Sequence, residues 1–341
     1  MKNQTFLKVV LCCSLGALVM LSTQVQGQPP QSRGRGLYGD WLVKVDYDGR
    51  SFDSILTFSR DQEGNRTAQW INFGGLIELK DVSFEDGKLS FTMERRNREG
   101  QTSVQKFTGT IQEGKLTGTL SSDSGERKAE GARMPRMPRA VGNWQMKFKV
   151  GDRDITTTLV VKADKENNLT AEWQSEWGEH AITDVQYERG NLSFKRKSKF
   201  QDREFESTFK GTVDRETDML SGVISMSEMG EIQAEGKRIG SPLIGDWMLE
   251  STSERGTRTQ RLRVNPDMSG LYGALPIKKV NFENGRVDFL LVLQFGDQSF
   301  EMTFEGKLED AKLIGEMTSS RGSQKVKGTK IVRTFRRRSS Q

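Results

Sequence analysis

Apolar and polar residues alternate at every second position along most of this chain, which is typical of β-strands with one buried face. One such face is formed by Val82, Phe84, Leu89, Phe91 and Met93. The dipeptide Asp86-Gly87 divides that run and readily supplies the positive φ angles of a tight hairpin. Since no stretch shows the 3.6-residue period of a helix, the pattern predicts antiparallel hairpins throughout.

The hairpin pattern occurs three times in the chain. A Gly-x-Trp motif recurs at intervals of 103 residues, with its tryptophan at Trp41, Trp144 and Trp247. A hairpin sequence recurs with it, at intervals of 103 and then 95 residues, at Asp81–Phe91, Asp184–Phe194 and Lys279–Phe289. The third copy is thus about eight residues shorter, in the stretch that contains Trp70 and Trp173 in the other copies.

Each copy predicts a small meander of strands. In the first copy, eight strand-like runs cover residues 40–47, 51–60, 66–73, 76–85, 88–96, 102–112, 115–122 and 126–134. The turns between them are too short for a crossover helix, so consecutive strands must be antiparallel neighbours. Closure removes both edges, and eight strands enclose a space that side chains can fill. We therefore predict an all-β protein of three eight-stranded up-and-down barrels, with a β-sandwich as the alternative for each.

These boundaries define the expected domain organisation. It consists of a signal peptide (1–27), a flexible linker (28–35), three β-modules (36–134, 140–239 and a shortened 243–333) and a basic tail (334–341). The linkers Pro135–Arg139 and Gly240–Pro242 are short and contain proline, so neither permits free tumbling. We expect three globular modules joined in a row.

The N-terminal segment has the pattern of a secretory signal peptide. Lys2 and Lys8 form a positive region, residues 9–21 are almost wholly apolar, and Val25-Gln26-Gly27 offers a cleavage site. The apolar run is shorter than the roughly 20 residues of a membrane span, so an uncleaved anchor is the less favoured alternative. We expect an exported protein, periplasmic or extracellular, with no transmembrane segment in the mature chain. Cleavage would remove Cys12 and Cys13, so each module must close its core without disulfides.

The charge balance is nearly even. The chain has 52 basic and 46 acidic residues, and loss of both signal-peptide lysines would leave 50 against 46, a net charge of +4. These charges are spread along the chain rather than gathered on one face, so we expect no nucleic-acid partner. Arg333, Arg336, Arg337 and Arg338 cluster at the C-terminal end, where a solvated terminus is favoured over contact with phosphate or an acidic surface.

The Gly-x-Trp motif at the start of an eight-stranded meander resembles the calycin group of lipocalins, avidins and fatty-acid-binding proteins. In lipocalins the tryptophan packs under a basic side chain near the end of the barrel. The resemblance therefore implies three Trp–cation pairs: Trp41–Arg133, Trp144–Arg238 and Trp247–Lys330. Each copy is much shorter than a lipocalin and lacks a long lid loop, which argues against a roomy ligand cup. Tandem repeats of this kind also resemble exported bacterial proteins of unassigned function.

The remaining tryptophans and the single histidine are candidate binding residues. Trp70 and Trp173 recur in the third strand, and Trp177 and His180 follow in the second copy. Aromatic rings at a barrel mouth can stack on sugars or cover an apolar ligand, although such rings also pack beneath loops. We assign Trp70, Trp173, Trp177 and His180 as candidate ligand-binding residues.

Catalytic and metal sites have weaker support. Glu176, Glu179 and Asp184 lie near His180 in sequence, but neighbouring strand residues such as Glu179 and His180 point to opposite faces. The acidic runs at Asp61–Asn65 and Asp164–Asn168 are explained by hairpin turns and lack the later glutamate of a calcium loop. We therefore predict no catalytic residue, no metal and no cofactor.

The sequence thus favours a non-catalytic exported protein that acts through three repeated barrel surfaces. Its partner would be an envelope protein or a small apolar or sugar ligand. The alternative is a hydrolase with its site in the second module, around Trp173, Glu176, Trp177 and His180.

Overall fold

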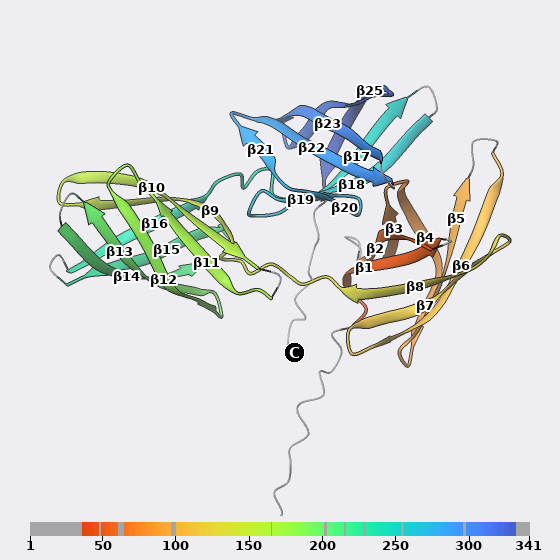
Figure 1. Cartoon of the computed structure of the whole chain (residues 1–341), viewed down its shortest axis with the longest axis horizontal. Coiled ribbons are helices and arrows are strands. Elements are labelled where there is room, and N and C mark those ends of the chain that lie inside the picture. Colours follow the sequence, from red (N-terminus) through yellow and green to blue (C-terminus); the bar gives the residue numbers. More distant parts are fainter. Residues whose placement is uncertain are drawn as a thin grey trace, which may run out of the picture. The chain divides into compact units, whose positions relative to one another are not determined.

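All regular structure in the described part of the chain is β-strand (Figure 1). The computed structural model describes residues 36–47, 49–60, 65–96, 100–164, 166–200, 203–214, 216–227, 230–253, 256–295 and 298–331. The predicted signal peptide, linker 28–35 and basic tail lie outside the described residues. Within the described ranges, no helix that could cross a membrane is found. The predicted all-β fold with three antiparallel modules in tandem is confirmed.

Module one is a closed barrel. Its strands are β1 (Gly39–Tyr47), β2 (Arg50–Arg60), β3 (Arg66–Asn72), β4 (Gly75–Glu85), β5 (Lys88–Arg96), β6 (Thr102–Gln112), β7 (Lys115–Ser122) and β8 (Gly125–Arg133). Each strand pairs with the next, and β1 also pairs with β8, so that Trp41 lies opposite Arg133. The predicted up-and-down barrel is confirmed here without a gap.

Module two is a nearly closed barrel with the same order of strands. Its strands are β9 (Gly142–Val150), β10 (Arg153–Ala163), β11 (Leu169–Gln174), β12 (Glu179–Glu188), β13 (Asn191–Phe200), β14 (Arg203–Val213), β15 (Met219–Met226) and β16 (Gly230–Arg238). β9 pairs with β16, which places Trp144 opposite Arg238. In the described residues no hydrogen-bonded ladder joins β11 to β12, so these strands flank an open seam.

Module three is also nearly closed but has nine strands rather than the predicted eight. They are β17 (Gly245–Ser253), β18 (Gly256–Val264), β19 (Gly270–Tyr272), β20 (Leu275–Ile277), β21 (Val280–Glu283), β22 (Arg286–Phe295), β23 (Gln298–Glu309), β24 (Lys312–Ser319) and β25 (Gly322–Lys330). The position that β4 fills in module one is here divided between the two short strands β20 and β21, which gives the extra strand.

The missing residues of module three come from two turns. Tyr272 lies opposite Leu262, as Trp70 lies opposite Leu56 and Trp173 opposite Leu159. Ten residues separate Leu262 from Tyr272, against fourteen from Leu56 to Trp70, so four residues are lost before this strand. The segment after this strand is also four residues shorter, since eight positions separate Tyr272 from Val280 and twelve separate Trp70 from Val82. Tyr272 therefore takes the place of the tryptophan and is buried like it.

A stacked pair of phenylalanines fills the centre of each barrel. The ring centres lie 4.7 Å apart for Phe91 and Phe107, and 5.0 Å apart for Phe194 and Phe209. The third pair, Phe289 and Phe304, has a separation of 4.9 Å. Two facing glycines make room for these rings, one on the strand of the second phenylalanine and one on the strand after it. A Cβ on Gly222, for example, would lie 2.7 Å from the Phe209 ring. Apolar side chains thus occupy the middle of all three modules.

The outer faces of β2 and β18 are buried as well as their inner faces. In β2, five consecutive residues from Ser54 to Phe58 are buried, whereas the equivalent strand β10 alternates between buried and more exposed positions. A strand that is buried on both faces must be covered from outside its own barrel. Modules one and three, which are not neighbours in sequence, cover each other at these strands.

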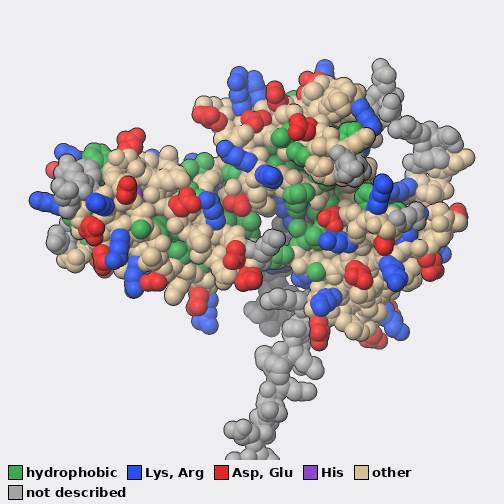
Figure 2. Space-filling view, viewed as in Figure 1, with side chains coloured by type: hydrophobic (Ala, Val, Ile, Leu, Met, Phe, Trp, Pro, Cys, Tyr) green, Lys and Arg blue, Asp and Glu red, His purple; other side chains and the backbone are tan. Residues whose placement is uncertain are grey.

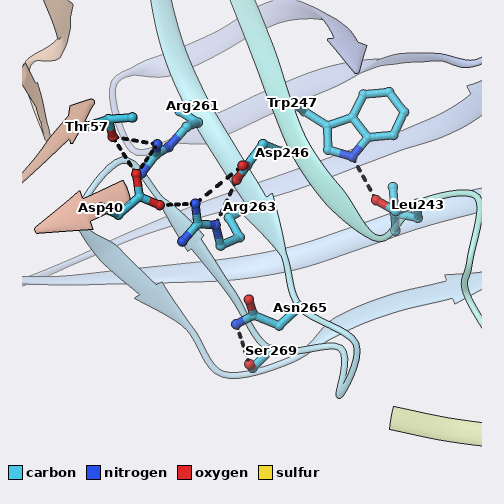
Figure 3. Close-up of polar contacts among 9 residues, drawn as sticks. All are labelled: Asp40, Thr57, Leu243, Asp246, Trp247, Arg261, Arg263, Asn265 and Ser269. Carbon is cyan, nitrogen blue, oxygen red and sulfur yellow. Dashed lines mark hydrogen bonds and ion pairs between the residues drawn. The ribbon is translucent and has the colours of Figure 1, made fainter. Parts of the chain in front are cut away.

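The contact between modules one and three contains what we call the inter-module ion cluster (Figure 3). Its buried members are Asp40, Arg261 and the uncharged Thr57, and its partly buried members are Asp246 and Arg263. Arg261 Nη1 lies 3.1 Å from Asp40 Oδ1 and 2.8 Å from Thr57 Oγ1. The Arg263 guanidinium bonds to Asp40 across the contact and to Asp246 Oδ1 at 2.7 Å within its own module. Burial alone would lower the pKa of Arg263, but the charges of Asp40 and Asp246 raise it above its ordinary value.

Apolar and backbone contacts surround this inter-module ion cluster. Ile55 and Ile71 of module one pack with Ala274 of module three in one buried group. Gln260 Nε2 donates a hydrogen bond to the backbone oxygen of Asn72 at 2.8 Å. The contact therefore combines a dry apolar patch with paired charges.

The same positions in module two lack the ion cluster. At the 103-residue interval, Asn143 replaces the aspartates at 40 and 246. Thr158 and Val160 stand where module three has Arg261 and Arg263. Module two therefore carries neither charge needed for this pairing, which selects modules one and three as partners.

Asp40→Asn is expected to destabilise the contact between modules one and three. The substitution leaves Arg261 buried without the carboxylate that faces it, and removal of one partner of a buried pair costs about 3–5 kcal/mol. Calorimetric unfolding would measure the loss. Asp46→Asn, an exposed aspartate at the end of the same strand, is the control and should change stability little. Equal unfolding of Asp40→Asn and wild type would contradict this account of the contact.

Candidate functional site

Each barrel has one end where a basic side chain lies over the first-strand tryptophan. The Cζ atom lies 5.0 Å from the Trp41 ring centre for Arg133 and 3.9 Å from the Trp144 ring centre for Arg238. Lys330 Nζ lies 5.5 Å from the ring centre of Trp247. A cation held over an indole contributes roughly 0.5–2 kcal/mol.

The same cations bind the segment that precedes each barrel. Arg133 donates to the Tyr38 oxygen, Arg238 to the Val141 oxygen, and Lys330 to the Pro242 oxygen. Arg238 also pairs with Asp218 at 2.8 Å. These contacts join the entering chain, the first strand and the last strand, so they close one end of each barrel.

Trp70 lies in the core of module one. Its side chain is 2% exposed, and its ring centre lies 6.0 Å from that of Phe91. It belongs to a different barrel from Trp173, Trp177 and His180, so the structure does not bring the four candidate ligand residues together. In this position Trp70 packs the barrel interior.

The other end of module two holds a group of inward-facing residues that we call the open-end cluster. Its members are Thr157, Trp173, His180, Arg196, Ser198 and Ser207. The Arg196 guanidinium lies 4.3 Å over the Trp173 ring, and its Nε donates to Ser207 Oγ at 3.1 Å. Arg196 is buried, and this burial lowers its pKa to about 10. Two of the four candidate ligand-binding residues, Trp173 and His180, thus belong to a cluster with polar residues that the alternation pattern does not identify.

His180 faces the same cluster from β12. Its Nδ1 lies 2.9 Å from Ser198 Oγ, directly across the β12–β13 ladder. Burial lowers the pKa of His180, the positive charge of Arg196 lowers it further, and the Trp177 backbone raises it by less. His180 is therefore neutral at pH 7, since its ordinary pKa is already about 6.5.

Trp177 projects from the connection between β11 and β12. Its side chain is 49% exposed, and its backbone N–H donates to Ser175 Oγ at 3.0 Å. This connection borders the open seam and leads to His180. The exposed indole of Trp177 is thus carried by the connection that leads to His180, whereas the ring of Trp173 in the open-end cluster is buried.

The acidic residues near His180 in sequence do not join it. Asp184 pairs with Lys195 at 2.8 Å, and Glu176 and Glu179 are exposed. Asp164 accepts hydrogen bonds from Asn168, which lower its pKa first through the side chain and then through the backbone. That turn has the hydrogen bonds of a hairpin. Among the described residues, no group of three metal-ligating side chains is found.

Two surface depressions also lie on module two. They have volumes of about 400 and 410 Å³ and share Asn191 and Ser193 at the opposite end of β13 from the open-end cluster. Neither is lined by Trp173, His180 or Arg196. Their lining is mainly polar side chains on hairpins, with no buried charged group.

Arg196 was missed by periodicity but could have been found by comparing the copies. In each copy the residue two positions after the first stacked phenylalanine is buried: Met93, Arg196 and Leu291. A charged residue at a position that is apolar in both other copies is the signal. Alternation alone assigns Arg196 to the inner face without showing that it lacks a counter-charge.

Comparisons with known proteins find only distant likenesses. No family model matches the chain, and no curated protein matches it. A candidate outer membrane protein from Bacteroides fragilis is 13% identical, with a TM-score of 0.23, and the match covers 58% of this chain and 94% of that one. Transferrin binding protein B from Haemophilus parasuis is 11% identical, with a TM-score of 0.20, covering 85% of this chain and 74% of that one.

A third solved structure is a DUF3598-family protein of unknown function from Nostoc punctiforme. It is 12% identical, with a TM-score of 0.20, and the match covers 86% of this chain and 96% of that one. At these scores the likenesses are distant.

His180 is expected to make stability depend on pH. Because its folded pKa lies below the ordinary value of 6.5, the unfolded chain takes up the proton first as the pH falls. The free energy of unfolding should therefore fall as the pH drops below about 6.5, and His180→Asn should lack this component. Denaturant unfolding of both proteins between about pH 7.5 and 5 would measure it. Parallel pH profiles would refute the assignment.

Proposed function

We propose that this is a non-catalytic exported binding protein whose ligand site is the open-end cluster of module two. Modules one and three form a structural pair through the inter-module ion cluster. The observation that carries the proposal is the buried Arg196 beside Trp173, at an end of a barrel whose middle is filled by Phe194 and Phe209. The filled interior leaves no place for an engulfed ligand. The ligand therefore binds at the mouth, against Trp177.

A small apolar or sugar ligand fits the exposed indole of Trp177. Both kinds of molecule present a flat or aliphatic face that an aromatic ring can cover. On the face that Figure 2 shows, basic and acidic side chains are interspersed, so no region of a single charge stands out there. An envelope protein remains the other partner class.

Export rests on the pattern of residues 1–27. A positive region, a short apolar run and small residues before the cleavage point are the three parts of a signal peptide. N-terminal sequencing of the protein recovered outside the cytoplasm should begin at Gln28. Recovery of the intact N-terminus from the cytoplasm alone would end the export proposal.

The rival hydrolase has one observation in its favour, the 2.9 Å contact between Ser198 Oγ and His180 Nδ1. A serine nucleophile needs a histidine that accepts its proton, usually beside a carboxylate that stabilises the imidazolium. Here the charged group that faces His180 is Arg196, which disfavours the imidazolium. Turnover of an ester probe that is lost in Ser198→Ala would nevertheless establish a hydrolase.

Trp177→Ala is expected to weaken ligand binding by about tenfold, because an aromatic contact contributes on the order of 1 kcal/mol. Native mass spectrometry of the protein from its own host would first show whether a small molecule is bound. Titration of sugars and amphiphiles, followed by tryptophan fluorescence and calorimetry, would then compare the variant with wild type. Phe52→Ala removes a comparably exposed aromatic from module one and is the control. If Trp177→Ala binds the ligand as tightly as wild type, Trp177 is not part of the binding site.

A further inference from the structure

Arg196 occupies a position that both other barrels fill with an apolar side chain. The equivalent residues Met93 and Leu291 are 1% and 0% exposed, and Arg196 is 8% exposed. A barrel of this size evidently closes with a methionine or a leucine there. The arginine in module two is therefore not required by the fold, and its burial opposes stability because a charge loses its hydration.

Arg196 also differs from the other buried arginines of the described residues. Arg238 pairs with Asp218 at 2.8 Å, and Arg261 pairs with Asp40 at 3.1 Å. In the described ranges Arg196 donates one hydrogen bond, from Nε to Ser207, and no carboxylate pairs with it. Buried charges in proteins are normally paired, so its counter-charge is expected to come from outside the chain.

The polar groups of the open-end cluster around Arg196 are hydroxyls and an imidazole rather than carboxylates. Ser207 Oγ accepts from Arg196 Nε and donates to the Arg196 backbone oxygen at 3.4 Å, and Ser198 Oγ contacts His180. Thr157 Oγ1, on the inner face of β10, is buried without a hydrogen-bond partner in the part of the chain that is described. His180 is neutral at pH 7, so the cluster carries a single positive charge. A planar guanidinium whose Nη atoms make no hydrogen bond to the described residues matches the two oxygens of a carboxylate.

We propose that Arg196 binds the carboxylate of a ligand whose remaining part lies outside the barrel against Trp177. This inference rests on the proposed binding function and names its ligand class. Only the carboxylate enters, because Phe194 and Phe209 fill the interior below it. The open seam between β11 and β12 lies beside the cluster and gives the headgroup its path.

Two pairs of probes test the proposal and distinguish the source of the carboxylate. Decanoate is compared with decanol, and galacturonate with galactose, by calorimetric titration of the full-length protein. Within at least one pair, the carboxylate is expected to bind at least about tenfold more tightly than its neutral partner. The pair that shows this preference identifies an amphiphile or an acidic sugar.

Arg196→Met, which restores the residue type of module one, should abolish this preference. Its melting temperature should equal or exceed that of wild type, because the substitution removes an unpaired buried charge. Lys197→Met changes the net charge equally on the outer face of β13, where Lys197 pairs with Glu206, and should retain the preference. Arg196→Lys keeps the positive charge but loses the planar guanidinium that can donate two parallel hydrogen bonds, so it should bind the carboxylate with intermediate affinity.

The outcomes separate the two proposals. If neutral probes bind to wild type as tightly as carboxylates, or if Arg196→Met retains the preference, the carboxylate assignment is overturned while the binding function stands. If wild type binds none of the four probes and Trp177→Ala does not weaken binding of any molecule that co-purifies with the protein, both proposals fail.

Discussion

The cation held over each first-strand tryptophan is the interaction on which the three barrels depend. The described residues contain no cysteine, so a module of about ninety residues must close by packing and hydrogen bonds alone. Arg238 shows the full arrangement, since it covers Trp144, bonds to the entering chain and pairs with Asp218. Lys330 has one charged group in place of a planar fork and makes a single such bond, to the Pro242 oxygen. The guanidinium therefore joins more of the chain at this end than the ammonium does.

Once closure is secured in this way, the other surfaces of the repeat are free to diverge. On the outer face, modules one and three have Asp40 and Asp246 at equivalent positions, and module two has Asn143. Module three alone adds Arg261 and Arg263, which bind across to Asp40. Buried ion pairs add little net stability because desolvation opposes them, but they penalise a wrong partner strongly. The ion cluster thus explains why modules one and three pair although module two lies between them in sequence.

The inner face of module two has also diverged, because polar residues replace apolar ones there. Arg196 replaces the methionine or leucine of the other copies, and His180 stands where module one has Ile77. These changes gather at the end away from the Trp144–Arg238 closure, where they disturb the barrel least. On the function proposed above, structural pairing and ligand binding fall to different modules of one repeat.

Much of this architecture follows from sequence alone. The repeat interval, the strand boundaries and the recurring tryptophans depend on alternation and spacing, which report local backbone geometry and the face that each side chain occupies. The basic partners of these tryptophans are what the resemblance to lipocalins implies. The contact between modules one and three could not be predicted from sequence, because Ile55 and Thr57 have the pattern of ordinary outward-facing residues and are buried only by another barrel. Likewise, sequence places Arg196 on an inner face, but only the tertiary structure decides that no carboxylate in the described chain lies beside it. The pairing of a buried charge depends on segments far apart in the sequence, and no local pattern carries that information.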